Sequence, residues 1–442
     1  MGELCRGKRA YAVIVLCTTT AIALPAQTFT TLFSFNITDG ELTEGALVQA
    51  ADGNLYGTTY WGGAPSDFCD IGCGTIFRIT SGGTLTTLYA FCPHRGCTDG
   101  GYPGAGLVEA TNRDLYGTTY GGGVSGAGTV FKITPSGTLT TLYSFCAQIG
   151  CTDGGSPLAA LIQATNGDFY GTTSYGGASG LGTVFKITPS GKLTTLYSFC
   201  SQSGCTDGET PDTALVQATN GDFYGTTCCG GANAYGTVFK ITPSGTLTTL
   251  YSFCSQSSGC TDGERPYAAL VQATNGDFYG TTSHGGANAY GTVFKITPSG
   301  TLTTLYSFCS QSGCADGSYP GTGLVEDTNG TFYGTTISGG ASGDGTVFSL
   351  SVGLGPFVKT LPTSGLVGGT VKILGTDLSG ATSVSFDGTA AVFEVPSSSL
   401  IITTVPASED APSWYWSPHP GTSAGANRVI GDLQNLKIVG NS

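Results

Sequence analysis

Charged side chains are scarce in this sequence, since Asp, Glu, Lys and Arg make up 10% of the 442 residues, against about 25% in an average soluble domain. Acidic residues outnumber basic ones by 29 to 16, for a net charge of -13. Such a chain repels phosphate backbones, so we exclude nucleic acid as a partner. Only three histidines are present, and none has the spacing of a catalytic triad or a metal site. We therefore expect no catalytic residue set, no cofactor and no bound metal.

Long apolar runs are also rare, and the one present lies at the N-terminus. Basic residues up to Arg9 precede the apolar run Tyr11–Leu24, which Pro25-Ala26-Gln27 follows. This layout predicts a secretory signal peptide over residues 1–26, because the run is too short for a membrane span of about 20 residues. Cleavage would remove three basic residues and Glu3, changing the net charge from -13 to -15. We expect an exported protein, extracellular or at the cell surface, with no transmembrane helix after cleavage.

Cysteine, by contrast, is abundant, with 16 residues, of which Cys5 and Cys17 precede the predicted cleavage site. The others include closely spaced pairs at equivalent places along the chain. In an oxidising compartment this spacing predicts small disulfide loops rather than zinc sites, which need about four ligands each. Cys228 and Cys229 are adjacent, and their state stays open because a bond between neighbours is strained. The predicted bonds join Cys92 to Cys97, Cys146 to Cys151, Cys200 to Cys205, Cys254 to Cys260, Cys309 to Cys314, and Cys69 to Cys73.

The tetrapeptide Tyr-Gly-Thr-Thr marks an internal repeat of about 54 residues. It starts at Tyr56, Tyr116, Tyr170, Tyr224, Tyr279 and Tyr333. Each copy holds four segments rich in Val, Ile, Phe, Tyr and Thr, separated by tight-turn sequences such as Asn166-Gly167 and Pro189-Ser-Gly191. The pattern predicts an all-β fold: a six-bladed β-propeller of four-stranded blades over residues 27–352.

The two ends of the repeat region are complementary. Phe29–Phe35 matches the last strand of a unit, whereas Gly345–Leu350 matches the third strand of the last unit. We therefore predict that the N-terminal strand closes the seam of the ring and leaves no exposed edge. An open solenoid is the alternative.

Strand alternation places both tight turns at one end of each blade. The long Gly-Gly loops and the cysteine loops then share the opposite face, where binding residues are expected. The two positions after Tyr-Gly-Thr-Thr vary between copies and carry aromatic side chains suited to stacking on a sugar or apolar ligand. Variation without a ligand is the alternative interpretation. The candidate ligand-binding residues are Tyr60, Trp61, Tyr120, Tyr175 and His284.

Carboxylates on the same face have two interpretations. An Asp-Gly pair recurs in every copy, at Asp39, Asp99, Asp153, Asp207, Asp262 and Asp316. These aspartates could collect Ca²⁺, but an Asp before Gly more often caps its own turn. Glu209 and Glu264 follow Asp-Gly in neighbouring copies, and they could form a carboxylate pair for glycoside cleavage or be solvated loop acids.

After Leu350 the repeat stops and a different β pattern begins. Residues 353–408 contain short alternating segments, such as Gly369–Gly375 and Thr382–Gly388, which predict a small C-terminal Ig-like β-sandwich. The string resembles the IPT/TIG family over its first two thirds. From 409 to 442 we expect an irregular tail, and a truncated domain and an altered reading frame both stay open.

The repeat itself resembles the GloVer tandem repeat of bacterial exported proteins that end in varied anchors. The resemblance covers residues 29–350 and includes Asn166–Thr173, Gly182–Ile187 and Leu193–Phe199. It implies a surface location without an established activity.

Three functions remain open from the sequence. The first is an exported or cell-surface binding or adhesion propeller that recognises glycan or protein through loops on one face. The second is an extracellular polysaccharide lyase or hydrolase, and the third is a purely structural surface component. We favour a protein that is not an enzyme, and the sequence does not determine the oligomeric state.

Overall fold

The computed structural model describes residues 31–66, 68–93, 96–256, 259–361, 365–366, 368–386, 388–406, 415–416 and 437–440. The predicted signal peptide and most of the predicted tail lie outside these residues. The described part of the chain is all-β, with four short 3-10 segments, η1 (Ile149–Cys151), η2 (Ser203–Cys205), η3 (Ser312–Cys314) and η4 (Leu378–Gly380).

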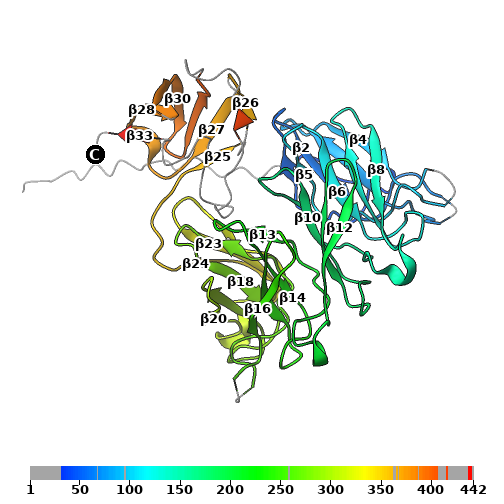
Figure 1. The fold of residues 1–442 in the computed structure, drawn as a ribbon. Helices are drawn as coiled ribbons and strands as arrows, with labels where there is room; N and C mark the ends of the chain where they lie inside the picture. Colours follow the sequence, from blue (N-terminus) through cyan, green and yellow to red (C-terminus); the bar gives the residue numbers. More distant parts are fainter. Residues whose placement is uncertain are drawn as a thin grey trace, which may run out of the picture.

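The first five copies of the repeat each form a four-stranded antiparallel sheet, with the strands in chain order. Figure 1 shows these sheets, here called blades, following one another from blue to green. Blade 1 contains β1 (Val48–Gln49), β2 (Leu55–Thr59), β3 (Thr75–Ile79) and β4 (Leu85–Ala90). Blade 2 contains β5 (Val108–Glu109), β6 (Leu115–Thr119), β7 (Thr129–Ile133) and β8 (Leu139–Ser144). Blade 3 contains β9 (Ile162–Gln163), β10 (Phe169–Thr173), β11 (Thr183–Ile187) and β12 (Leu193–Ser198). Blade 4 contains β13 (Val216–Gln217), β14 (Phe223–Thr227), β15 (Thr237–Ile241) and β16 (Leu247–Ser252). Blade 5 contains β17 (Val271–Gln272), β18 (Phe278–Thr282), β19 (Thr292–Ile296) and β20 (Leu302–Ser307).

Each residue of the Tyr-Gly-Thr-Thr motif has a structural role, which blade 3 illustrates. Tyr170 is 1% exposed, and its ring stacks on Phe223 of the next blade at 4.1 Å between centroids. A Cβ on Gly171 would lie 2.7 Å from Phe185 Cζ, so the close ring requires glycine. Thr172 Oγ1 donates to the carbonyl of Thr213 in the next blade at 3.1 Å. Thr173 Oγ1 is 2.8 Å from Thr183 Oγ1 on the neighbouring strand. The motif therefore recurs because it builds the blade and its junction with the next one.

Consecutive blades share apolar cores. Five clusters of buried side chains join blade 1 to 2, 2 to 3, 3 to 4, 4 to 5 and 5 to 6. An edge-to-face ring pair recurs at each of these junctions, for example Phe145 with Phe185 at 5.2 Å and Phe199 with Phe239 at 5.2 Å. Burial of these rings provides most of the driving force that holds one blade against the next.

Blade 6 differs from the others because it lacks an outer strand among the described residues. It contains β21 (Ser318–Pro320), β22 (Val325–Glu326), β23 (Thr331–Ser338) and β24 (Thr346–Ser351). β21 and β22 both pair with β23 and are two parts of the inner strand, while β24 is at the edge.

The predicted pairing of the N-terminal strand with blade 6 is not found among the described residues. Residues 31–35 form no strand and no ladder with β24. They pack on blade 1 instead, where the ring centroid of Phe35 lies 5.1 Å from that of Phe77. The equivalent rings at the junction of blades 1 and 2, Phe91 and Phe131, are 5.3 Å apart. The segment thus keeps the contacts that an outer strand makes with the following blade. The ladder is missing because blades 6 and 1 are not packed on each other.

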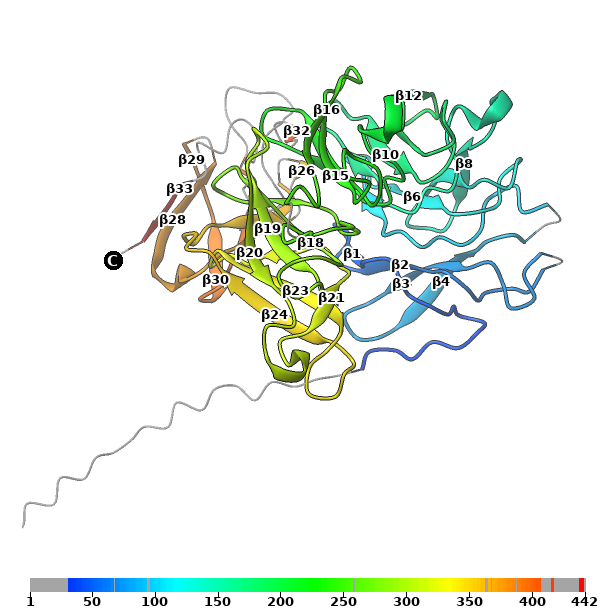
Figure 2. The same ribbon diagram turned by 90° about the horizontal axis from the view of Figure 1, so that it is seen from below.

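Exposed side chains on both sides of the seam confirm this separation. Tyr333 of blade 6 is 41% exposed, although its counterpart Tyr170 is 1% exposed. Leu47 of blade 1 is 53% exposed, whereas its counterpart Leu161 is 5% exposed. The seam between the first and last blades is therefore open. Figure 2 shows the strands of these two blades in blue and in yellow.

The C-terminal part is a small β-sandwich with its own core of Val371, Ile373, Val384, Phe386 and Ile401, among others. Its strands are β25 (Lys359–Leu361), β26 (Gly365–Leu366), β27 (Thr370–Leu374), β28 (Ala381–Phe386), β29 (Thr389–Ala391), β30 (Phe393–Ser397), β31 (Leu400–Thr404), β32 (Tyr415–Trp416) and β33 (Lys437–Gly440). One sheet has the order β25-β27-β31-β30 and another β29-β28-β33, while β26 pairs with β32. Two segments of the predicted irregular tail, β32 and β33, are thus strands, and Ile438 packs against the core.

Candidate functional site

The face that carries the long loops also carries disulfides, each of which closes one short loop. The structure contains all six of the predicted bonds: Cys69–Cys73, Cys92–Cys97, Cys146–Cys151, Cys200–Cys205, Cys254–Cys260 and Cys309–Cys314. The Gly-Gly loops lie on the same face, because the amide of Gly177 donates to the carbonyl of Cys151 at 2.9 Å and Gly231 donates to Cys205 at 2.8 Å. We call this surface the disulfide face.

The recurring aspartates of the disulfide loops accept hydrogen bonds from their own loops. Asp207 is fully buried, and it accepts hydrogen bonds from Tyr197 Oη at 2.7 Å and from the amide of Ser201 at 2.9 Å. In Asp316 burial alone would raise the pKa. Hydrogen bonds from Tyr306 Oη and from the backbone of the same loop outweigh that effect and lower the pKa of Asp316 to about 2. These contacts favour the turn-capping interpretation of the aspartates.

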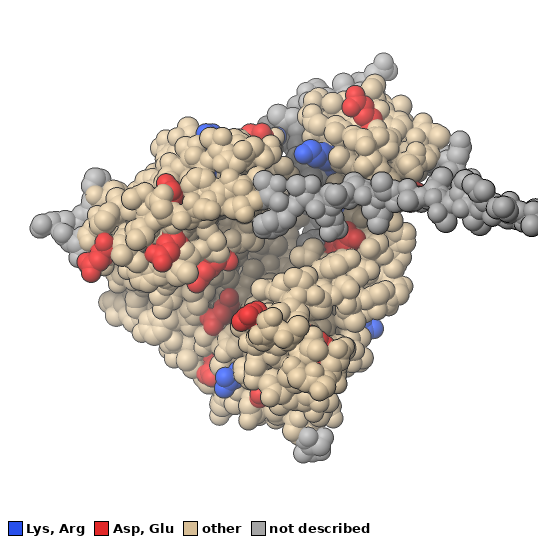
Figure 3. Space-filling view, turned by 180° about the vertical axis from the view of Figure 1, so that it is seen from behind, with Lys and Arg blue, Asp and Glu red and all other residues tan. Residues whose placement is uncertain are grey.

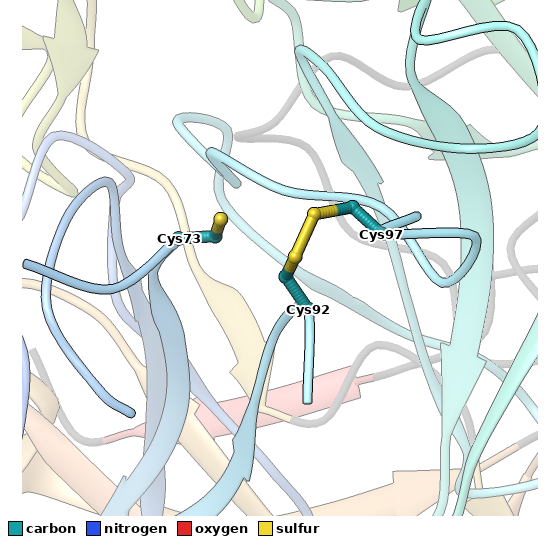
Figure 4. A group of neighbouring side chains, drawn as sticks. All are labelled: Cys73, Cys92 and Cys97. Carbon is teal, nitrogen blue, oxygen red and sulfur yellow. A yellow bond between two sulfur atoms is a disulfide. The ribbon is translucent and has the colours of Figure 1, made fainter. Parts of the chain in front are cut away.

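Three cysteine sulfurs lie close enough to resemble a metal cluster. The Sγ atoms of Cys73, Cys92 and Cys97 are all within 4.8 Å of one another, and Figure 4 shows them side by side. However, Cys92 is bonded to Cys97 and Cys73 is bonded to Cys69. Two neighbouring disulfides therefore account for this group, since a metal would need free thiolates.

Two of the predicted ligand-binding residues, Tyr60 and Trp61, come together at the end of β2. Their ring centroids are 5.5 Å apart, and Tyr102 from the start of blade 2 joins them, stacked on Tyr60 at 5.3 Å and edge-on to Trp61 at 4.9 Å. All three side chains are partly exposed. We call Tyr60, Trp61 and Tyr102 the aromatic cluster. Tyr102 was not predicted, because its contact with Tyr60 crosses between two copies of the repeat.

A carboxylate and a glycine adjoin the aromatic cluster. The position that a Cβ of Gly104 would occupy lies 3.2 Å from Tyr60 Cδ2 and 3.4 Å from Glu44 Oε2. Burial raises the pKa of the Tyr60 hydroxyl, and the nearby Tyr120, Glu44 and Tyr102 add to that rise. The amide of the predicted residue Tyr120 donates to the carbonyl of Tyr102 at 3.0 Å, and Tyr120 is 39% exposed.

The other predicted residues lie apart from this cluster. Tyr175 is 54% exposed and pairs through its backbone with Gly155. His284 lies 5.0 Å from the ring of Tyr319, and its Nδ1 is 2.8 Å from Ser283 Oγ. The structure thus joins Tyr60, Trp61 and Tyr120 in one region, while Tyr175 and His284 occupy the corresponding places in blades 3 and 5.

A second group of reactive side chains lies in blade 4. Cys228 and Cys229 are free, with their Sγ atoms 3.0 Å apart. Burial raises the pKa of Cys228, and Cys229, Asp212 and Glu209 raise it further. Asp212 Oδ1 is buried without a hydrogen-bond partner, and burial raises the pKa of this carboxyl to about 6. The Asp212 carboxyl can hold a proton near neutral pH, but the Cys228 thiol is a poor nucleophile.

No helix among the residues described here is long and apolar enough to cross a membrane.

The fold and the disulfide face define an all-β repeat protein of the propeller class followed by an Ig-like module. The chain belongs to the family described as the Gloeobacter/Verrucomicrobia repeat, whose model matches residues 17–219 and 201–384. The IPT/TIG domain model matches residues 356–420. Both predicted resemblances are confirmed.

Curated protein sequences gave no match, but solved propeller structures did. A protein from Thermus thermophilus described as an oxidoreductase (glucose dehydrogenase) is 16% identical, with 71% of this chain and 98% of that chain covered and a TM-score of 0.40. The periplasmic gluconolactonase of Pseudomonas aeruginosa is 15% identical, with 75% and 95% covered and a TM-score of 0.36. At these values neither activity transfers to this chain.

Proposed function

We propose that this protein is an exported binding protein that recognises a glycan through the aromatic cluster on its disulfide face. The observation that carries the proposal is the grouping of Tyr60, Trp61 and Tyr102, whose ring centroids lie within 5.5 Å of one another. Partly exposed aromatic rings with polar tips suit the apolar face of a sugar ring. Tyr120 is close enough to extend this surface, and Tyr175 and His284 offer separate contacts on neighbouring blades.

Export is part of the same proposal. Six disulfides form and persist in an oxidising compartment, which agrees with removal of residues 1–26 as a signal peptide. The mature protein would then comprise the propeller region 27–352 and the Ig-like module from residue 353. The repeat family supports a location outside the cytoplasm or on the cell surface.

A glycan array tests the proposal directly. We expect the mature protein to retain a defined set of glycans, and we expect Trp61→Ala and Tyr102→Ala to lose them. Tyr235→Ala is the matched control, because Tyr235 is a 39% exposed tyrosine on the Gly-Gly loop of blade 4. If Trp61→Ala retains the same glycans, the aromatic cluster is not the glycan-binding site.

A polysaccharide lyase or hydrolase is the second candidate, and Asp212 is the observation that favours it. A carboxyl with a pKa of about 6 suits a general acid at neutral pH. Glu209 lies in the same blade, where its amide donates to the carbonyl of Cys229 at 3.0 Å. Release of reducing ends from a polysaccharide panel, abolished by Asp212→Asn or Glu209→Gln, would favour this function. If neither the array nor this assay responds, the protein is a structural surface component.

A further inference from the structure

The open seam leaves the outer strand position of blade 6 unfilled beside β24. We propose that a second copy of this chain fills it. Residues 29–35 of that copy add to β24 as an outer strand, and its blade 1 packs on the face of blade 6. Copies then join head to tail in concentrated solution, because two different surfaces meet. In dilute solution the contact dissociates and leaves the edge of β24 unpaired.

A cavity of about 330 Å³ lies beside β24. It is lined by Tyr306 and Phe308 of blade 5 and by Leu350 of β24, among others. In blade 3 the counterpart of Leu350 is Ile187, which pairs with Leu193 of the outer strand. Leu193 packs into the core that blades 2 and 3 share. Among the described residues no outer strand of blade 6 does the same in the core of blades 5 and 6. The cavity is therefore the place that an outer strand takes in the other blades.

The edge of β24 carries no charge that would keep another strand away. Its sequence is Thr-Val-Phe-Ser-Leu-Ser, and Ser349 stands where blade 3 has Lys186. Native proteins often place lysine on exposed edges to prevent other strands from adding. Figure 3 shows the wider surface, where charged side chains are few and most of the presented face carries neither sign. The edge of β24 is therefore open to strand addition.

Blade 6 also exposes apolar side chains that the earlier blades bury. Val347 of β24 is 79% exposed, and Val325 and Tyr333 of the same blade are exposed as well. The counterparts of Val347 in blades 1 to 5 are at most 1% exposed, namely Ile76, Val130, Val184, Val238 and Val293. Grouped apolar side chains on a surface mark a contact with a partner.

Blade 1 exposes the surface that fits this face of blade 6. At the junction of blades 2 and 3, Leu161 of blade 3 packs with Tyr116 and Val130 of blade 2 in one buried core. Leu47 of blade 1 is the counterpart of Leu161, and Val347 of blade 6 is the counterpart of Val130. Both Leu47 and Val347 are exposed. The two ends of one copy thus carry the two halves of a junction that the chain makes five times, and two copies complete it.

A second copy completes this junction without any change in the rest of the ring. Closure within one copy requires blades 6 and 1 to move together, which changes the packing between other blades. Each of the five junctions is held by a buried apolar core. Their edge-to-face ring pairs keep nearly the same spacing, with centroids 5.0–5.3 Å apart. Docking of a second copy leaves these junctions unchanged, since its residues 31–35 already lie on its own blade 1.

Light scattering on the mature protein over a range of concentrations tests the proposal. We expect the mass to rise from one copy to two or more, and to stay high at high salt because the contact is apolar. Val347→Lys places a charge in the contact and should raise the concentration needed for assembly about 10-fold or more. Val124→Lys is the matched control, because Val124 is also 79% exposed but lies on the Gly-Gly loop of blade 2. It should assemble as the wild type does.

A mixture of two variants tests whether different surfaces meet. Leu47→Lys alters blade 1 and leaves blade 6 intact, whereas Val347→Lys alters blade 6 and leaves blade 1 intact. We expect each variant alone to stay monomeric at concentrations where the wild type assembles. An equimolar mixture should form dimers and nothing larger, because only one intact pair of surfaces is available. Both residues are exposed, so the melting temperatures of the variants should match that of the wild type.

A protein that stays monomeric at every concentration would overturn the proposal. If β24 is nevertheless protected from hydrogen exchange in that monomer, residues 29–35 close the ring of their own copy. Assembly that Val347→Lys leaves unchanged would also overturn the proposal, because the copies would then meet through another surface. A mixture of the two variants that remains monomeric would contradict the head-to-tail contact.

Discussion

At the scale of single residues, Gly171 shows how one atom decides whether two blade strands fit together. A Cβ at this position would lie 2.7 Å from Phe185 Cζ and 2.9 Å from Leu161 Cδ2. We expect Gly171→Ala to lower stability by about 1–3 kcal/mol, because overpacking forces buried side chains out of place. Thermal unfolding followed by circular dichroism measures the effect.

The matched control for this change is Gly82→Ala. Near Gly82 the closest atom to an added Cβ is Thr80 Oγ1 at 3.8 Å, so the variant should be neutral or slightly more stable. Equal melting temperatures for both variants would contradict the role assigned to Gly171.

Asp212 gives a prediction with a defined dependence on pH. Burial raises the pKa of its carboxyl from 3.8 to about 6, so the folded state holds this proton more tightly than the unfolded chain does. The resulting stability is fully present below pH 3.8 and is lost as the pH rises through about 6. We expect Asp212→Asn to gain stability relative to the wild type between pH 4 and pH 7, by about 3 kcal/mol at most.

Denaturant titrations at the two pH values measure this difference. The control is Asp344→Asn, an exposed acid on a loop of blade 6, whose stability difference from the wild type should not change with pH in this way. A pH-independent difference for Asp212→Asn would show that the carboxyl is solvated.

Residues that act within one repeat were predictable from the sequence, whereas those that act between repeats were not. The cysteine pairs follow from spacing because both partners lie in one loop. Tyr102 was missed because its partner Tyr60 belongs to the preceding blade. The available signal was variation, since the positions equivalent to Tyr102 hold Leu42, Ser156, Thr210, Arg265 and Tyr319.

At the scale of structural elements, the disulfide loop is stabilised by its aspartate in addition to its disulfide bond. Asp207 accepts from Tyr197 Oη, from the Ser201 amide and from the Gln202 amide at 2.7, 2.9 and 3.3 Å. We expect Asp207→Asn to lower stability by about 1.5–3 kcal/mol, because hydrogen bonds to a charged acceptor are lost. Thermal unfolding with and without EDTA measures both this effect and any bound ion.

EDTA should leave the melting temperature of the wild type unchanged if the aspartates serve only as loop caps. A lower melting temperature in EDTA that Ca²⁺ restores would instead support an ion among these aspartates.

Strand positions were predicted well by turn residues but strand lengths were not. The turns Asn166-Gly167 and Pro189-Ser-Gly191 separate β9 from β10 and β11 from β12, as expected. The inner strand β9 keeps only two residues. The chain just before β9 leaves the ladder at Pro157. Pro157 packs closely on the preceding blade, because a Cβ added to Gly128 of that blade would lie 2.8 Å from Pro157 Cδ. The short strand thus goes with close packing between blades, which one repeat cannot reveal.

At the scale of the whole molecule, the open seam exposes one edge of the sheet array. Within the described part of the chain β24 pairs only with β23, whereas the equivalent strand β19 is paired on both sides with β18 and β20. We expect backbone amides of β24 to exchange with deuterium faster than those of β19, because unpaired amides are not protected. Hydrogen exchange read by mass spectrometry on peptides covering the two strands measures this.

Protection of β24 equal to that of β19 would contradict an open seam and would indicate that the segment before residue 36 covers the edge in solution. The sequence predicted such closure from the match between Phe29–Phe35 and an outer strand. Sequence similarity identifies a segment that is able to pair, but pairing also requires blades 6 and 1 to approach. In the structure Tyr333 and Leu47, whose counterparts make such a junction elsewhere, stay exposed.

The central claim is that a sugar ring stacks on Tyr60, Trp61 and Tyr102. A crystal structure of the mature protein bound to the glycan that the array retains most strongly tests it most directly. We predict sugar density over these three rings. Density at another blade, with the three rings bare, would contradict the claim.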